Sequence, residues 1–283
     1  MSIKYQDKRT DFRFTHPIET VEWLSKEEGI RDKRGRDKRG SYGWTMNQGG
    51  YNTERQSWTG DACWADMIDM AQTGWTAGTT DIINQIDQIE HVQDEELSGY
   101  RFDVTGQFFD VGLVVSGEPE CWFEQEMEPT RKVVSICSNI SSSGGIEAGT
   151  LARRGAAIIA LVDQLQTAGY IVELTAVAGL SNGEKTMFVW WEFGCTPLDI
   201  DAAALVLAHP GWFRIVGHNL AQCGNNDCYG NYCQELDREE RRKYTLYFDS
   251  GDLRTESGRY LNNSADAAQW VNAQIKKIGE MEL

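Results

Sequence analysis

One histidine and three cysteines in the C-terminal third of the chain carry side chains that can ligate zinc. His218, Cys223, Cys228 and Cys233 follow one another at intervals of five residues. Structural zinc sites instead pair their ligands about two to four residues apart. Loop-like segments between these residues could still wrap around an ion, so a metal-dependent enzyme is one function class to consider. We predict that the four side chains do not converge on one metal ion.

A strongly basic segment near the N-terminus could bind nucleic acid. Residues 31–39 form a near-tandem repeat with six Lys or Arg and two Asp, a net charge of +4, in a chain whose formal charge is −16. Basic side chains neutralise phosphates, and aromatic rings stack on unpaired bases. The candidate residues are Arg31, Lys33, Arg34, Arg36, Lys38, Arg39, Tyr42 and Trp44. The alternative is a solvated charged loop, or an arm that docks on the acidic surface of the chain.

A polar loop follows the most regular strand that the sequence predicts. The strand runs from Lys132 to Cys137, the loop from 138 to 149, and an amphipathic helix from Thr150 to Ala168. A second strand covers 170–177. Strand, helix and strand in this order predict a right-handed crossover and parallel pairing. Open α/β sheets bind ligands at the carboxyl ends of such strands, where this loop lies.

The spacing Asn139-x-Ser141-x-Ser143, with the helix and strand that follow, resembles the metal-ion-dependent adhesion motif of von Willebrand factor A domains over residues 131–220. In that family an Asp and two Ser hold Mg²⁺, and a Thr and an Asp from later loops complete the site. The resemblance implies Thr196 and Asp199 as the later partners. Asn139 departs from the family because it is uncharged, and divalent cations prefer charged oxygen ligands. We therefore expect weak Mg²⁺ binding or none, and the alternative is a loop whose Ser and Asn cap the helix.

Three short segments resemble an uncharacterised protein family of tailed phages. They are DVG at residues 110–112, GEPEC at 117–121 and RRGAA at 153–157. The resemblance implies a phage origin, and with it the cytoplasm of an infected host cell as the location.

Composition sets the broad class of the protein. A chain of 283 residues with 41% hydrophobic and 11% aromatic residues can build a core in one large domain or two small ones. No apolar run reaches the roughly 18 residues of a membrane span, and the N-terminus lacks the apolar stretch of a signal peptide. Seven cysteines, an odd number, are then most simply reduced thiols in a cytoplasm. We expect no membrane association.

Periodicity predicts the remaining elements. We expect further helices at 18–28, 61–74, 79–95, 199–209 and 264–278, and further strands at 110–115, 186–193, 212–216 and 245–248. The strand at 186–193 should pair with 170–177 across the turn at 181–184.

The sequence as a whole predicts an α/β fold with a mostly parallel central sheet flanked by helices. We expect an N-terminal arm at 1–58, an α+β extension at 59–130 and a von Willebrand A-like core at 131–283. The chain has no nucleophile elbow, phosphate-binding loop or dinucleotide fingerprint. We therefore expect a non-enzymatic phage accessory protein that binds nucleic acid, with single-stranded DNA as the expected form, and a protein partner in transcription or replication. The alternative is a protein–protein adaptor without nucleic-acid binding.

Overall fold

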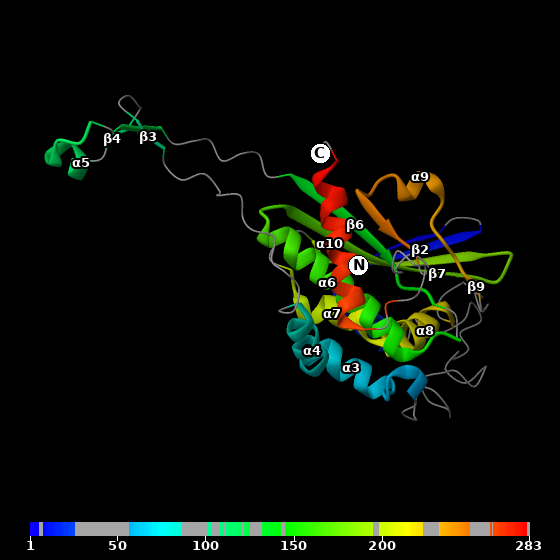
Figure 1. Ribbon diagram of the computed structural model, residues 1–283. Helices are drawn as coiled ribbons and strands as arrows, with labels where there is room; N and C mark the ends of the chain where they lie inside the picture. The colour runs from blue at the N-terminus through cyan, green and yellow to red at the C-terminus, as the bar shows by residue number, and fades with distance from the viewer. Residues whose placement is uncertain are drawn as a thin grey trace.

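The computed structural model describes residues 1–5, 8–25, 57–86, 101–103, 108–109, 111–119, 122–124, 132–142, 145–194, 198–222, 232–249, 261 and 263–281. These residues build a central β-sheet with helices on one face and a shorter polar segment on the other (Figure 1). The fold class is therefore α/β, as the sequence predicts. Among the described residues no helix is long and apolar enough to cross a membrane.

The central sheet is mixed, so the prediction of a mostly parallel sheet is wrong. Its strands lie in the order β1-β2-β8-β7-β6-β10, and β9 pairs with the end of β7. Their bounds are β1 Ser2–Tyr5, β2 Arg9–Phe14, β6 Val133–Asn139, β7 Ile171–Ser181, β8 Thr186–Glu192, β9 Tyr232–Cys233 and β10 Leu246–Phe248. The pairs β2–β8, β6–β7 and β6–β10 are parallel, whereas β1–β2, β7–β8 and β7–β9 are antiparallel. A tight turn joins β7 to β8, and two strands joined in this way must run in opposite directions.

The predicted strand–helix–strand unit is present as β6, α6 and β7. Helix α6 covers Ala148–Thr167, close to the predicted range, and β6 and β7 pair in parallel from Val133↔Ile171 onward. Helices α7 (Ile200–Ala208) and α10 (Ser264–Gly279) pack against α6, and Figure 1 shows the three together on one side of the sheet. The predicted helices at 199–209 and 264–278 are thus confirmed.

Side chains of β8 alternate between two cores on the two faces of the sheet. Met187, Val189 and Trp191 belong to the large core under the helices. Phe188 and Trp190 point to the other face, where they pack with Leu236, which precedes the short helix α9 (Arg238–Arg241). A strand buried on both faces reads as a continuous apolar run, which explains the sequence of β8.

An outer layer of helices lies beyond the central ones. It consists of the 3-10 turn η2 Ser57–Thr59, α3 Trp64–Thr73 and α4 Thr76–Ile86. Contacts of α3 and α4 with α7 join this layer to the core. Helix α1, Pro17–Ser25, instead packs directly on the sheet: Thr20 accepts a hydrogen bond from Trp191 of β8, and Trp23 lies against Phe12 of β2. Three short strands, β3 Arg101–Asp103, β4 Phe108–Phe109 and β5 Trp122–Glu124, form a separate small sheet.

Three local predictions are wrong. The expected strand at 110–115 is the short helix α5, Val111–Ser116, and the expected strand at 212–216 is the π-helix η3, Trp212–Gly217, which continues into α8, His218–Gln222. Short apolar runs do not distinguish a strand from a buried helix, and all six residues of η3 are buried. The first 14 residues, for which the sequence predicts no strand, supply β1 and β2.

His209, directly after α7, makes folding stability sensitive to acid. It is 5% exposed, and its Nδ1 accepts a hydrogen bond from the backbone N–H of Gly211 at 3.0 Å. Burial lowers the pKa of His209 to about 4, although Asp66 opposes this shift. A neutral imidazole is therefore required in the folded chain.

We predict that protonation of His209 lowers the free energy of unfolding as the pH falls. The unfolded chain binds a proton on it below about pH 6.5, whereas the folded chain does so only near pH 4. The contribution of His209 to the free energy of unfolding is complete above its pKa in the unfolded chain. It is lost as the pH falls toward its pKa in the folded chain, by about 3 kcal/mol at most. Urea unfolding of wild type and His209→Asn across this range should show a shallower pH dependence in the variant. Identical slopes would assign the acid sensitivity to other groups.

Candidate functional site

The strand order reverses at β6, which makes its carboxyl end the expected ligand position. Strand β7 lies on one side of β6 and β10 on the other, both parallel to it. In open α/β sheets, ligands bind in the crevice at such a switch point. Here the crevice lies between Asn139, the last residue of β6, and Asp249, which follows β10. Both side chains are buried.

Hydrogen bonds fill this crevice with the chain's own groups. The Asn139 Nδ2 group donates to Asp249 Oδ1 at 2.9 Å and to the carbonyl oxygen of Gln234 at 3.2 Å. Its Oδ1 accepts from the backbone N–H of Ser141 at 3.0 Å. Two acceptors on the nitrogen side and one donor on the oxygen side fix the orientation of the amide. The carboxamide is therefore fully used within the protein.

A crossing segment, residues 232–236, seals the carboxyl edge of β7. The Gln234 N–H donates to the carbonyl oxygen of Gly179 at 2.9 Å, and β9 pairs with Leu180 and Ser181. A Cβ at Gly179 would lie 2.1 Å from the Gln234 oxygen, so only glycine allows this approach. We call residues 232–236 the strap. It covers the edge that the resemblance to von Willebrand A domains assigns to a ligand.

The Ser141 hydroxyl also makes its hydrogen bonds within the protein. Its hydroxyl donates to the Gly179 carbonyl oxygen at 3.0 Å and accepts from the Gly179 N–H at 2.8 Å. Arg154 of α6 donates to the Asn139 carbonyl oxygen. These bonds tie the end of β6 to β7 and α6.

The resemblance implies a Mg²⁺ ion, and the residues do not fit one. At the first position of the motif, the side-chain N–H group of Asn139 points at Asp249. A residue that binds a cation at this position would have to present an oxygen there instead. Within the described part of the chain, no group of three or more His, Cys, Asp or Glu side chains could hold a metal ion. The donor groups of the Asn139 amide therefore do not suit a cation at this position.

Of the five residues expected to share an ion site, two lie together. Asn139 and Ser141 lie at the carboxyl end of β6, as predicted, whereas Ser143 and Thr196 fall outside the described residues. Asp199 caps α7 by accepting from the Ala202 N–H at 3.0 Å, and it lies 3.2 Å from His16. Because β8 runs antiparallel to β7, the chain leaves β8 at the opposite edge of the sheet, so Asp199 is remote from Asn139.

Asp249 is a partner that the sequence patterns did not reveal. The sequence predicts the strand before it at 245–248, and a carboxylate directly after a buried strand was the available signal. Asp249 also lies beside Glu235 of the strap. A hydrogen bond with Asp249 and the nearby Arg241 lower the pKa of Glu235.

The remaining predicted site residues are only partly described. The candidate nucleic-acid residues, Arg31 through Trp44, lie outside the described part, as do Cys223 and Cys228. His218 opens α8 and packs against the Phe213 ring, with centroids 5.4 Å apart, and Cys233 lies in β9. Whether the four zinc candidates converge stays a prediction.

A groove of about 560 Å³ lies beside the strap. One wall is formed by Lys8 and Arg9 at the start of β2 with Thr186 and Phe188 of β8, and the other by Gln234, Glu235, Asp237 and Glu240. Arg9 pairs with Thr186 in the sheet, and Thr186 pairs with Ser181 at the carboxyl end of β7. The groove therefore opens at the same edge of the sheet as the sealed crevice.

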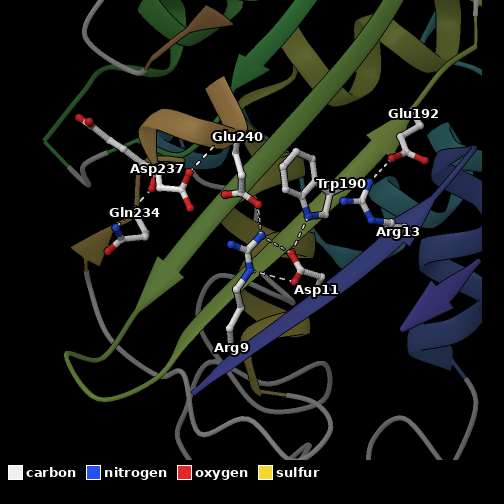
Figure 2. Close-up of polar contacts among 9 residues, drawn as sticks. Arg9, Asp11, Arg13, Trp190, Glu192, Gln234, Asp237 and Glu240 are labelled. Atoms are coloured by element: carbon white, nitrogen blue, oxygen red, sulfur yellow. Dashed lines mark hydrogen bonds and ion pairs between the residues drawn. The ribbon is translucent and has the colours of Figure 1, made fainter. Parts of the chain in front are cut away.

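An ion-pair network fixes the walls of this groove (Figure 2). Arg9 donates from Nε and Nη2 to the two oxygens of Asp11 at 2.9 and 2.8 Å, and from Nη2 to Glu240 Oε1 at 2.6 Å. The indole Nε1 of Trp190 donates to Asp11 Oδ1 at 2.9 Å. Burial lowers the pKa of Arg9, but its bonds to Asp11 and Glu240 raise it above the ordinary value. Arg9 therefore joins β2 to α9 as a permanent cation.

We predict that Asp11→Asn destabilises the protein by about 2–4 kcal/mol, because it leaves a partly buried guanidinium without its bidentate partner. The Asp11 side chain is 7% exposed. The neighbouring pair Arg13–Glu192 is the matched control, since both side chains are 41% exposed. Glu192→Gln should cost less than about 1 kcal/mol. Denaturant unfolding measures both, and equal losses would refute a special role for the Arg9 network.

Comparison with known proteins gives one family. A family model described as a domain of unknown function (DUF7192) matches residues 22–279. No curated protein and no solved structure matches the chain. Since the match covers most of the sequence, the chain belongs to the DUF7192 family.

Proposed function

We propose that this protein is a non-enzymatic adaptor that holds a segment of a protein partner in the groove between the strap and strands β2 and β8. The observation that carries the proposal is the position of the groove. It opens at the carboxyl edge of β6 and β7, beside a switch-point crevice that the chain itself fills. A partner that approaches this edge of the sheet therefore meets the groove.

The chemistry of the lining supports recognition by insertion of side chains. The volume of about 560 Å³ is within the range of small-molecule pockets and accommodates one or a few side chains. Lys8 supplies a donor, and the carboxylates of Glu235 and Asp237 supply acceptors. In the same wall, the Arg9 guanidinium lies over the Phe188 ring, 4.5 Å from its centroid, and its bonds to Asp11 and Glu240 hold it in place. Such preorganisation lowers the entropy lost on binding.

The core is proposed to be a metal-independent relative of the von Willebrand factor A fold. Support comes from the parallel unit β6–α6–β7 and from the Asn139 and Ser141 side chains at the carboxyl end of β6. In this proposal the adaptor binds its partner without a bridging cation.

Photo-crosslinking tests the adaptor proposal. Lys8 lines the groove, whereas Lys132 lies at the amino end of β6, and both side chains are exposed. A photoreactive residue at position 8 should capture a defined partner protein in the cells where the protein naturally occurs, and one at position 132 should not. Mass spectrometry identifies the products. The same products at both positions, or products at position 132 alone, would rule out the groove as the partner site.

A second candidate function is binding of single-stranded nucleic acid, in phage transcription or replication. The observation that favours it is the sequence of residues 31–39, with six Lys or Arg against two Asp. Phosphate neutralisation by such a segment would act locally, in spite of the formal charge of −16.

We predict that changing Lys33, Arg34, Arg36, Lys38 and Arg39 together to Ala abolishes most single-strand binding. The slope of log affinity against log salt should shrink by roughly 0.7 for each phosphate that the variant no longer neutralises. A matched variant removes five exposed cations elsewhere: Arg238, Arg242, Lys243, Lys276 and Lys277. Gel shifts with single-stranded DNA should separate the two variants. Equal binding by both, or no binding by the wild type at low salt, would eliminate this function.

A further inference from the structure

We propose that the Asn139 carboxamide replaces a cation at the switch-point crevice and latches the strap and β10 to the end of β6. The inference rests on the von Willebrand A-like interpretation in the proposed function. It goes further in one respect: because the latch is a single amide, replacing its nitrogen by oxygen should make the stability of the protein depend on a cation.

Two oxygens face the Nδ2 atom of Asn139. They are Asp249 Oδ1 at 2.9 Å and the Gln234 carbonyl oxygen at 3.2 Å. The two N–H groups of an amide satisfy both. The oxygens come from separate parts of the chain, the end of β10 and the strap, so the amide cross-links three segments.

Burial makes these bonds hard to replace. Asn139 is 1% exposed and Asp249 is 6% exposed, so water cannot substitute for a lost donor without rearrangement. Buried acceptors that lose their donor retain the full cost of desolvation. Loss of the amide therefore weakens the closed strap, which the Gln234 N–H and β9 also hold to β7.

An oxygen at the position of Nδ2 would reverse the electrostatics of the crevice. In Asn139→Asp, a carboxylate oxygen would face the Asp249 carboxylate and the Gln234 carbonyl. Three oxygens that face one another repel, and a hard divalent cation or a proton relieves the repulsion. Wild type should then be indifferent to divalent cations, and the variant should depend on them.

Thermal unfolding of the full chain tests this inference. In EDTA at about pH 8, Asn139→Asp should lower Tm by roughly 5–10 °C. Adding Mg²⁺ or Mn²⁺ should recover much of the loss, whereas wild-type Tm should not respond to the cations. Asn182→Asp is the matched control, because the Asn182 Oδ1 accepts from the backbone N–H groups of Glu184 and Lys185 in the turn between β7 and β8, so a carboxylate keeps both bonds. It should not respond to cations.

A swapped pair keeps the test decisive if Asn139→Asp does not fold. The double variant Asn139→Asp with Asp249→Asn restores one amide–carboxylate bond with the roles exchanged, so it should fold and should not respond to cations. The inference is overturned if wild-type Tm rises with a divalent cation and Asn139→Ala removes the rise. It is also overturned if Asn139→Asp matches wild type in EDTA, or if the swap is no better than the single variant. Lys8 crosslinking is a separate readout, so failure here leaves the adaptor proposal to its own test.

Discussion

The two N–H groups of Asn139 decide what the carboxyl edge of this sheet can do. They satisfy the carboxylate of Asp249, which follows β10, and the Gln234 carbonyl oxygen of the strap, and in doing so they fill the crevice where an α/β sheet ordinarily takes a ligand. A carboxylate at this position would present a third oxygen to the other two, whereas the amide presents two donors.

On the face of the sheet that carries α9, the Arg9 network holds the chain together in a similar way, because it joins β2 to α9. Phe12 and Phe14 of β2 are fully buried, and Asp11 holds both Arg9 and the Trp190 indole. The family match begins at residue 22, after β2 has ended. The groove wall at Lys8 and Arg9 thus lies outside the matched region, although its burial and bonds make it part of the same sheet.

Sequence patterns predict the elements that are long and periodic. Helix α6, the parallel pair β6–β7 and the hairpin of β7 and β8 follow from apolar spacing and a turn at 181–184. The π-helix at Trp212 has the sequence of a strand because six buried residues in a row carry no period. Asp249 escapes prediction for another reason: its partnership with Asn139 joins residues 110 positions apart, and local patterns hold no information on which loops meet.

The mixed character of the sheet and the existence of the groove have one cause. The turn at 181–184, which the sequence reveals, sends β8 antiparallel to β7. Its first residue, Thr186, therefore lies at the carboxyl edge of β7, and β2, parallel to β8, brings Arg9 to the same place. Had β8 run parallel, its amino end and the start of β2 would lie at the opposite edge, away from the strap. The groove exists because the sheet is mixed, and it also needs β2, a strand that the sequence patterns do not reveal, which is why the sequence points to the crevice and not to the groove beside it.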